Sequence, residues 1–262
     1  MRKPKSDYAI QTVVNAMRVL EAFRDDEELG VTEISRRLAL HKNNVFRLLA
    51  TLEQRGYIEQ SSDNERYRLG IRSLELGRSF ARSHSLLRCA AAVLRKLAER
   101  TRESAHLAVI EDFEVVHLHG EQIERPVMTG LRNGRRLPAH CTALGKVLLA
   151  CAPDKVREAY DREFVANRGL EERTPATIVD PEKFFEHLRT VAMRGFATDL
   201  GECDIGLSCT AAPVFDADGR VVAAVSVSAP RFRLGEGRAL EATAELVVAA
   251  GEELSRELGY GL

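Results

Sequence analysis

Apolar residues between positions 31 and 52 recur every three or four residues, which is the spacing of amphipathic helices. Ile34 and the leucine one turn later mark a first short helix, for which Thr32 is a candidate N-cap. After a break a second helix follows, with its N-cap expected at Asn43 or Asn44. The inner stripe of this second helix consists of Val45, Leu48, Leu49 and Leu52. The pattern predicts a helix-turn-helix.

The period changes to two directly after this second helix. Residues 57–60 and 67–69 alternate apolar and polar side chains, and the turn cluster 61–64 separates them. A two-stranded hairpin in this place is typical of a winged helix-turn-helix. An earlier helix, expected over residues 9–23, has an apolar stripe that should pack: Ile10, Val13, Val14, Met17, Leu20 and Phe23. We therefore place a winged helix-turn-helix domain at residues 8–70, and we expect residues 1–7 to fray.

Two further helical stretches follow, with a break near Ser83 to Ser85. The first, residues 71–84, has the features of a linker helix, with Ile71, Leu74 and Phe80 on its apolar side. A helical linker transmits orientation between domains better than a flexible coil does. The second stretch opens another domain, residues 85–262, and carries a stripe formed by Leu86, Ala90, Val93, Leu94 and Leu97.

The remaining domain mixes strands and helices. Alternating apolar residues predict a hairpin around Asp112 and Phe113, and buried strands near the C-terminus are almost continuously apolar. The further elements expected in chain order are a strand within 126–138, a helix from Thr142, a helix over 181–194 capped by Asp180 and ended by Gly195, strands within 197–215 and 220–230, and a helix over 237–258. The fold class is therefore α/β mixed, of the α+β kind, with an antiparallel sheet flanked by helices.

Composition limits the function classes. The chain has 262 residues with 45% hydrophobic and 29% charged residues, which is ordinary for a protein of two folded domains. No apolar run approaches the roughly 20 residues of a membrane span, and the N-terminus has no apolar region for secretion, so a cytoplasmic protein without a membrane partner is expected. The five cysteines include no CxxC pair, and His117 and His119 lack a third ligand, so neither a metal nor another cofactor is expected.

Charge favours DNA as the partner of the first domain. Residues 34–52 contain four basic residues and no acidic one, whereas the whole chain has a net charge of -1. Lys and Arg neutralise phosphates or reach guanine, and Asn can pair with adenine. The candidate DNA contacts are Thr32, Arg36, His41, Lys42, Asn43, Asn44 and Arg47, with Arg66 and Arg68 on the wing. The alternative is that these charges form a solvated helix face.

Three stretches of the second domain favour a pocket for a small carboxylate. Ala143, Leu144 and Gly145 begin a helix, whose free backbone N–H groups form an anion site. Ser226 and Ser228 stand two apart on one strand, so both hydroxyls face the same side.

Asp199 and Cys209 complete the set. Each feature has an alternative: the hydroxyls could bond neighbouring backbone, Asp199 could hold a loop, and Cys209 could be a small core residue. Lys146 could pair with a carboxylate, although a surface lysine is the commoner case.

The whole chain resembles the IclR family of bacterial transcriptional regulators. The front half carries TEISRRLAL, VFRLLATLEQRGYIE, YRLG and LELG in order, and the rear half carries RRLPAHCTALGKVLLA, RGFATD and GLSCTAAPVFDADGRVVAAVSVSAP. The resemblance implies a GAF-like effector-binding domain in which the backbone of Ala143 and Leu144 faces the ligand. The side chains implied to face it as well are Asp199, Cys209, Ser226 and Ser228. One departure is Ala229, where many members carry glycine.

These observations predict a ligand-responsive regulator. It is expected to bind a roughly palindromic double-stranded operator as a homodimer or homotetramer, and to respond to a small carboxylate. The resemblance favours a repressor over an activator. Two alternatives remain: a redox or metal sensor built on Cys203 and Cys209, and an enzyme with Cys209 or Cys141 as nucleophile. The enzyme is not expected, because no third group would orient a catalytic base.

Overall fold

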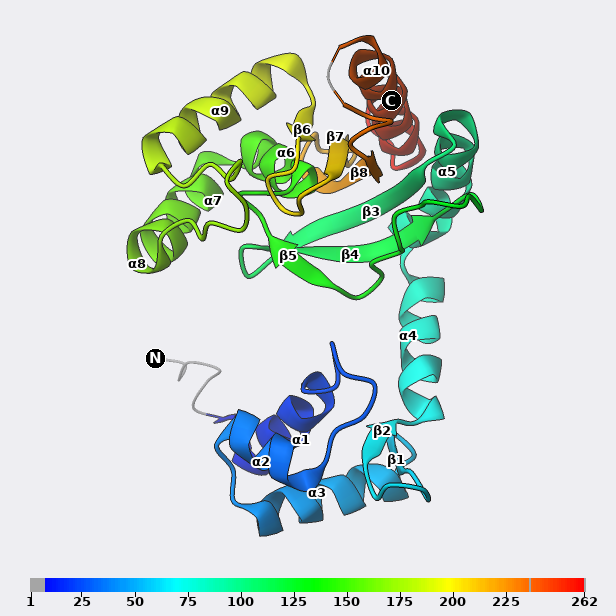
Figure 1. Cartoon of the computed structure of the whole chain (residues 1–262), viewed down its shortest axis with the longest axis vertical. Coiled ribbons are helices and arrows are strands. Elements are labelled where there is room, and N and C mark those ends of the chain that lie inside the picture. Colours follow the sequence, from blue (N-terminus) through cyan, green and yellow to red (C-terminus); the bar gives the residue numbers. More distant parts are fainter. Residues whose placement is uncertain (1–7, 236, 262) are drawn as a thin grey trace. The chain divides into compact units, whose positions relative to one another are not determined.

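The computed structural model describes residues 8–235 and 237–261, so residues 1–7, for which fraying was expected, lie outside the described residues. The chain divides into two compact units, residues 1–83 and 84–262 (Figure 1).

The first unit is a winged helix-turn-helix, as predicted. Its elements are α1 (Gln11–Glu21), α2 (Val31–Leu38), α3 (Lys42–Gln54), β1 (Ile58–Gln60), β2 (Tyr67–Leu69) and α4 (Ile71–Ser83). The predicted stripe of α3 points inward, where Val45 and Leu49 are completely buried. The backbone of Leu29 pairs with that of Tyr67 through two hydrogen bonds of 2.9 Å, which adds a third short segment to the wing.

The predicted helix caps are wrong in detail. Gly30, not Thr32, is the N-cap of α2, and its N–H donates to the Glu33 carboxylate at 2.9 Å. His41 caps α3, because its Nδ1 accepts the N–H of Asn43 at 3.3 Å. Each helix therefore begins one or two residues before the predicted cap, and a carboxylate at the third helical position or an imidazole ahead of the helix bonds an N–H group at its start. The side chain of Asn43 is therefore not used as a cap.

The apolar stripe predicted for α1 packs only at its C-terminal end. Phe23 is buried and Leu20 packs against the same core, whereas Ile10, Val13 and Met17 are 67%, 51% and 52% exposed. Val19 also contributes to the core. The linker helix α4 buries none of its residues, and Ile71 is 65% exposed. The period of 3.6 was identified correctly, but within one chain these two apolar faces remain uncovered.

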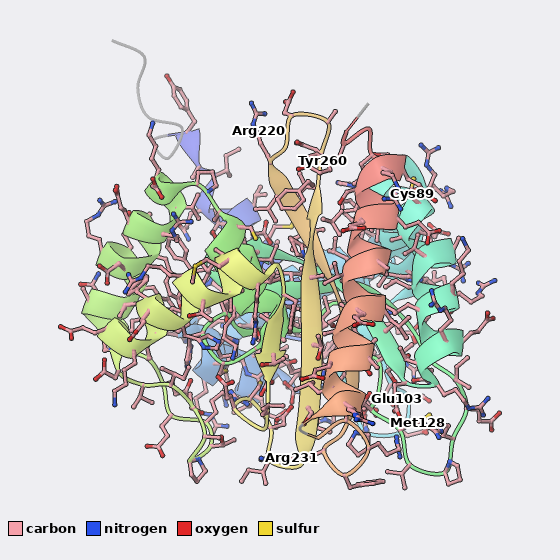
Figure 2. The ribbon with its side chains drawn as sticks, turned by 90° about the horizontal axis from the view of Figure 1, so that it is seen from above. Cys89, Glu103, Met128, Arg220, Arg231 and Tyr260 are labelled. Atoms are coloured by element: carbon pink, nitrogen blue, oxygen red, sulfur yellow. The ribbon has the colours of Figure 1, made fainter. Side chains whose placement is uncertain are left out.

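The second unit is a six-stranded antiparallel sheet with helices on both faces, which confirms the α+β prediction. Its strands are β3 (Ser104–Glu111), β4 (Glu114–Glu121), β5 (Arg136–Pro138), β6 (Ala197–Asp199), β7 (Leu207–Phe215) and β8 (Val221–Pro230), in the order β5-β4-β3-β8-β7-β6. Its helices are α5 (Ser85–Thr101), α6 (Ala143–Cys151), α7 (Asp154–Ala159), a π-helical segment (Tyr160–Val165), α8 (Ala166–Arg168), α9 (Pro181–Arg194) and α10 (Arg238–Glu257). Figure 2 shows α10 and α5 on one side of the sheet and the other helices on the opposite side. In the same view Arg220 and Tyr260 mark one end of the sheet, and Glu103 and Arg231 mark the other.

Successive side chains of β8 lie on opposite faces of the sheet. Val225 and Val227 belong to the core under α5 and α10, whereas Ala224 belongs to the core under α6 and α9. Because side chains alternate along a strand, Ser226 and Ser228 lie on the α6 side. The two hydroxyls therefore share a face, as predicted.

Two predicted strands are shorter than expected. Of the strand predicted within 126–138, β5 covers only Arg136–Pro138. Residues 126–135 lie outside the strands, and the hydroxyl of Thr129 donates to the carbonyl oxygen of Ser228 at 2.9 Å. The stretch 197–215 divides into β6 and β7, with a loop of residues 200–206 between them. Both irregular segments border the cavity described below. Within residues 8–235 and 237–261, we find no helix whose length and apolar content would let it cross a lipid bilayer.

Candidate DNA-binding face and effector pocket

The outer face of α3 carries most of the predicted DNA contacts. The predicted residues on and around it are all exposed: His41, Lys42, Asn43, Asn44 and Arg47, with Thr32 and Arg36 on α2. Burial of Val45 and Leu49 on the opposite face fixes this orientation. In the part of the chain that the structure describes, we find no ion-pair partner for Lys42 or Arg47, so both charges are available to phosphates.

Phe46 lies beside these residues on α3 and is 56% exposed. This position was not predicted, because a lone phenylalanine outside the buried stripe gives no signal of its exposure. An exposed aromatic side chain among polar ones suits the 5-methyl group of thymine in a major groove.

The two wing arginines already have partners. Arg66 donates to the carboxylate of Glu33 at 2.7 Å and to the carbonyl oxygen of Glu28 at 2.9 Å. Arg68 pairs with Glu59 across the hairpin at 2.6 Å. Arg66 therefore joins the wing to the start of α2, and DNA contact by either arginine stays a prediction.

A small cavity, here called the α6 pocket, lies between the sheet and the start of α6. Its walls are His106, His117, Arg132, Leu137, Thr142, Ala143, Leu144, Asp199, Cys203, Asp204, Leu207, Cys209, Ser226 and Ser228. All six residues predicted to contact an effector are among them, although they come from the separate elements α6, β6, β7 and β8. The space open to the centres of water-sized spheres is about 30 Å³, which is room for about two water molecules.

The start of α6 is held tightly against the preceding turn. Thr142 is the N-cap, and its hydroxyl accepts the N–H of Gly145 at 3.2 Å. The N–H of Gly145 is therefore already hydrogen-bonded, so its expected place in the anion site is wrong. The N–H groups of Ala143 and Leu144 remain as candidates for that site. A side chain at Gly145 would not fit, because its Cβ would lie 2.2 Å from the carbonyl oxygen of Ala139.

Asp199 organises the opposite loop. Its Oδ1 accepts the N–H groups of Glu202 at 2.6 Å and Cys203 at 3.4 Å. Burial raises the pKa of Asp199 to about 6, although Lys146 acts in the other direction. Asp199 thus holds the loop and also lines the α6 pocket.

Lys146 is not the surface lysine that we considered the commoner case. It is completely buried, and its Nζ donates to the Glu202 carboxylate at 2.6 Å. Burial raises the pKa of Glu202, and the ammonium of Lys146 opposes that shift. This ion pair connects α6 to the loop that carries Asp199, Cys203 and Asp204. The sequence gives no signal for it, since the lysine sits on an all-apolar helix and its partner lies 56 residues away.

A second ion pair lies in the wall of the α6 pocket. Arg132, from the segment between β4 and β5, donates to Asp204 at 2.6 Å. Both residues line the pocket, so its wall includes a charged pair that the sequence analysis did not select.

Comparison with known proteins identifies the chain. The family description "IclR helix-turn-helix domain" matches residues 12–62, and "Bacterial transcriptional regulator IclR C-terminal" matches residues 79–256. The chain belongs to the IclR family. The family assignment confirms the resemblance and makes this a DNA-binding regulator of transcription.

Individual relatives extend over almost the full chain. The HTH-type transcriptional regulator KdgR of Escherichia coli K12 is 33% identical over 259 residues, which cover 98% of this chain and 95% of the relative. The transcriptional repressor IclR of the same strain is 29% identical, with 96% and 90% covered. A solved IclR homolog from Microbacterium hydrocarbonoxydans, complexed with 4-hydroxybenzoate, has a TM-score of 0.81 at 29% identity and covers 94% of this chain and 98% of that one.

The cysteines of this IclR-family chain do not form a catalytic arrangement in the described residues. All five are free thiols. Cys209 donates to the hydroxyl of Ser228 at 3.2 Å, and burial raises the pKa of its thiol to about 12. His140, the neighbour of Cys141 in the chain, bonds the carbonyl oxygen of Glu171 instead of a thiol. The group that acts most strongly on the thiol of Cys203 is Cys141, which lowers its pKa.

Among residues 8–235 and 237–261, no group of three His, Cys, Asp or Glu side chains is arranged to hold a metal ion. His117 lines the α6 pocket, whereas His119 lies 3.2 Å from Glu121.

Proposed function

We propose that this IclR-family regulator binds a roughly palindromic operator as a homodimer or homotetramer and releases or retains it according to a small carboxylate in the α6 pocket. The observation that carries the proposal is the convergence of all six predicted effector residues on one cavity. Packing alone gives no reason for two serines, an aspartate and a helix start to meet there.

For DNA, the proposal places the exposed face of α3 in the major groove. Lys42 and Arg47 contact phosphates or guanine, and Asn43 and Asn44 reach base edges. The side chain of Phe46 adds an apolar contact to a thymine methyl group. Chromosomal DNA as a partner places the regulator in the cytoplasm.

For the effector, the two oxygens of the carboxylate bind two different sets of hydrogen-bond donors. The amides of Ala143 and Leu144 meet one oxygen at the positive end of α6, and the hydroxyls of Ser226 and Ser228 meet the other. The homolog that binds 4-hydroxybenzoate, a carboxylate, supports this ligand class. We expect the protein to act without a cofactor and without turnover of the effector.

For assembly, the uncovered apolar faces support a homodimer through the first unit. Val13 and Met17 on α1 and Leu76 on α4 are 51%, 52% and 63% exposed. A second copy of the same surface would bury them, and a palindromic operator needs such a pair. Relatives named as repressors favour repression over activation.

Two sets of variants test the proposal by separating its halves. Ser226→Ala with Ser228→Ala is expected to abolish the effector response and to leave operator affinity unchanged. The matched control is Ser208→Ala, because Ser208 is equally buried on β7 but does not line the α6 pocket. A double variant that responds like the wild type would remove the serines from the site.

Arg47→Ala is expected to weaken operator binding about tenfold and to leave carboxylate binding intact. Arg100→Ala, an exposed arginine of the second unit, is the control for loss of one positive charge. Equal effects of the two arginine variants on operator affinity would refute the assignment of α3.

A further inference from the structure

Two histidines line the α6 pocket beside the residues assigned to the carboxylate. His106 is on β3 and His117 is on β4, and they are 2% and 4% exposed. Their rings meet edge to face, with centroids 5.6 Å apart. Neither histidine belongs to the predicted effector contacts.

The ring nitrogens of this pair are not used inside the protein. In residues 8–235 and 237–261, both nitrogens of His106 and Nδ1 of His117 lack a hydrogen-bond partner. Buried polar atoms are almost always paired, because an unpaired one loses its hydration without compensation. An apolar side chain would fill the same space without that loss, so packing does not explain an imidazole here.

The surrounding backbone leaves room for the ring of His106. A Cβ at Gly120, its neighbour on β4, would lie 3.0 Å from Nδ1 of His106 and 2.8 Å from the side chain of Leu131. Ser226 is the direct partner of His106 across β3 and β8, so the hydroxyl and the imidazole lie side by side on the same face. An acid held by Ser226 therefore brings its next atoms close to His106.

The charge state of the pair limits what it can bind. Burial, followed by the neighbouring His117 and Arg132, lowers the pKa of His106 to about 3. Burial and Arg132 lower the pKa of His117 to about 4. Neutral imidazoles offer one donor and one acceptor each, which suits a hydroxyl or carbonyl oxygen better than a second carboxylate. Arg132 adds no free charge for a second carboxylate, because Asp204 compensates it.

We propose that His106, supported by His117, binds an uncharged oxygen of the effector, so that the effector is a small hydroxy- or oxo-carboxylic acid. This inference rests on the proposed function, since it requires a carboxylate in the α6 pocket. The small volume of the cavity favours acids of a few carbon atoms. His106 is then a specificity-determining residue, and the carboxylate donors supply affinity common to all acids.

The test is calorimetric titration of the full-length protein with acids that differ only in the oxygen. Propionate is compared with lactate and pyruvate, and butyrate with 3-hydroxybutyrate. In the wild type, at least one oxygenated acid is expected to bind about tenfold more tightly than its parent. His106→Phe, which fills the space without nitrogens, is expected to abolish that difference, and His106→Gln, which keeps a donor and an acceptor, is expected to restore part of it.

His187→Phe is the matched control, because His187 also has a buried unpartnered nitrogen but lies outside the α6 pocket. Thermal melts confirm that each variant is folded. If the acids bind but the oxygen makes no difference, or makes the same difference in His106→Phe, the inference is overturned and the carboxylate site stands. If none of the acids binds the wild type, the carboxylate site and the inference fall together.

Discussion

The buried ion pair between Lys146 and Glu202 allows a quantitative prediction. Lys146 is fully buried, the Glu202 side chain is 11% exposed, and Nζ lies 2.6 Å from Oε1. Lys146→Met keeps the length of the side chain and removes the charge. The carboxylate of Glu202 then loses its one buried cation, and it must take up a proton or draw in water.

The magnitude follows from the burial of both partners. Removing one member of a buried ion pair costs about 3–5 kcal/mol, because the other charge remains buried without compensation. If the free energy of unfolding falls by about 2 kcal/mol per M of urea, this destabilisation lowers the urea concentration at the unfolding midpoint by about 2 M. Lys146→Met with Glu202→Leu removes both charges and is expected to recover most of the loss.

The assay is urea unfolding at pH 7, followed by circular dichroism. Lys96→Met is the matched control, because Lys96 pairs with Glu253 at 2.7 Å on the surface, where the two side chains are 62% and 37% exposed. That exposed pair is expected to contribute little, because solvent and salt screen it. If Lys146→Met costs no more than Lys96→Met, or if the double variant is no more stable than the single one, the reasoning about this pair is wrong.

Three further predictions concern pH and assembly. The pKa of Asp199 is about 6 and a bound carboxylate raises it further, so effector affinity should increase by up to about tenfold per unit as the pH falls towards 6 and should level off below 6, and titrations of Asp199→Asn should be flat over that range. The pKa values of His106 and His117 lie below the 6.5 of the unfolded chain, so their contribution to stability is complete above pH 6.5 and is lost as the pH falls towards 4. Urea unfolding of His106→Phe should show a weaker pH dependence there, and an unchanged slope would contradict its burial as a neutral ring. Met17→Glu on α1 should give a monomer in analytical ultracentrifugation and weaken operator binding, whereas Met193→Glu, 82% exposed on α9, should do neither; a dimer that survives Met17→Glu would remove α1 from the interface.

The apolar periodicity of the sequence was sufficient to predict the helices and strands. It was insufficient to predict what covers their apolar faces. The stripe of α3 faces the core as predicted, because its partners lie in the same short domain. The N-terminal part of the equally clear stripe of α1 is exposed, since a sequence pattern records that a face is apolar and not whether its partner is in the same chain. The hairpin at β3 and β4 was found because its turn and its alternation are both local.

The α6 pocket likewise contains residues that the sequence indicated and residues that it did not. Its serines, its helix start and Asp199 stand in recognisable motifs, so the sequence pointed to them. His106, Arg132 and Lys146 have no local signal, because the position of His106 depends on strand pairing and the other two depend on ion-pair partners 72 and 56 residues away. The caps of α2 and α3 were assigned wrongly because several residues near each start could accept the same N–H groups, and only the backbone geometry selects among them.

The most direct test of the account is the anisotropy of labelled DNA from immediately upstream of the gene, titrated with the full-length protein at fixed salt with and without the acids named above. Salt is fixed because affinity that arises from phosphate contacts depends steeply on it. We expect tight binding that at least one small hydroxy- or oxo-acid changes in the wild type and does not change in Ser226→Ala with Ser228→Ala. DNA binding that every acid leaves unaltered would contradict control of the operator through the α6 pocket.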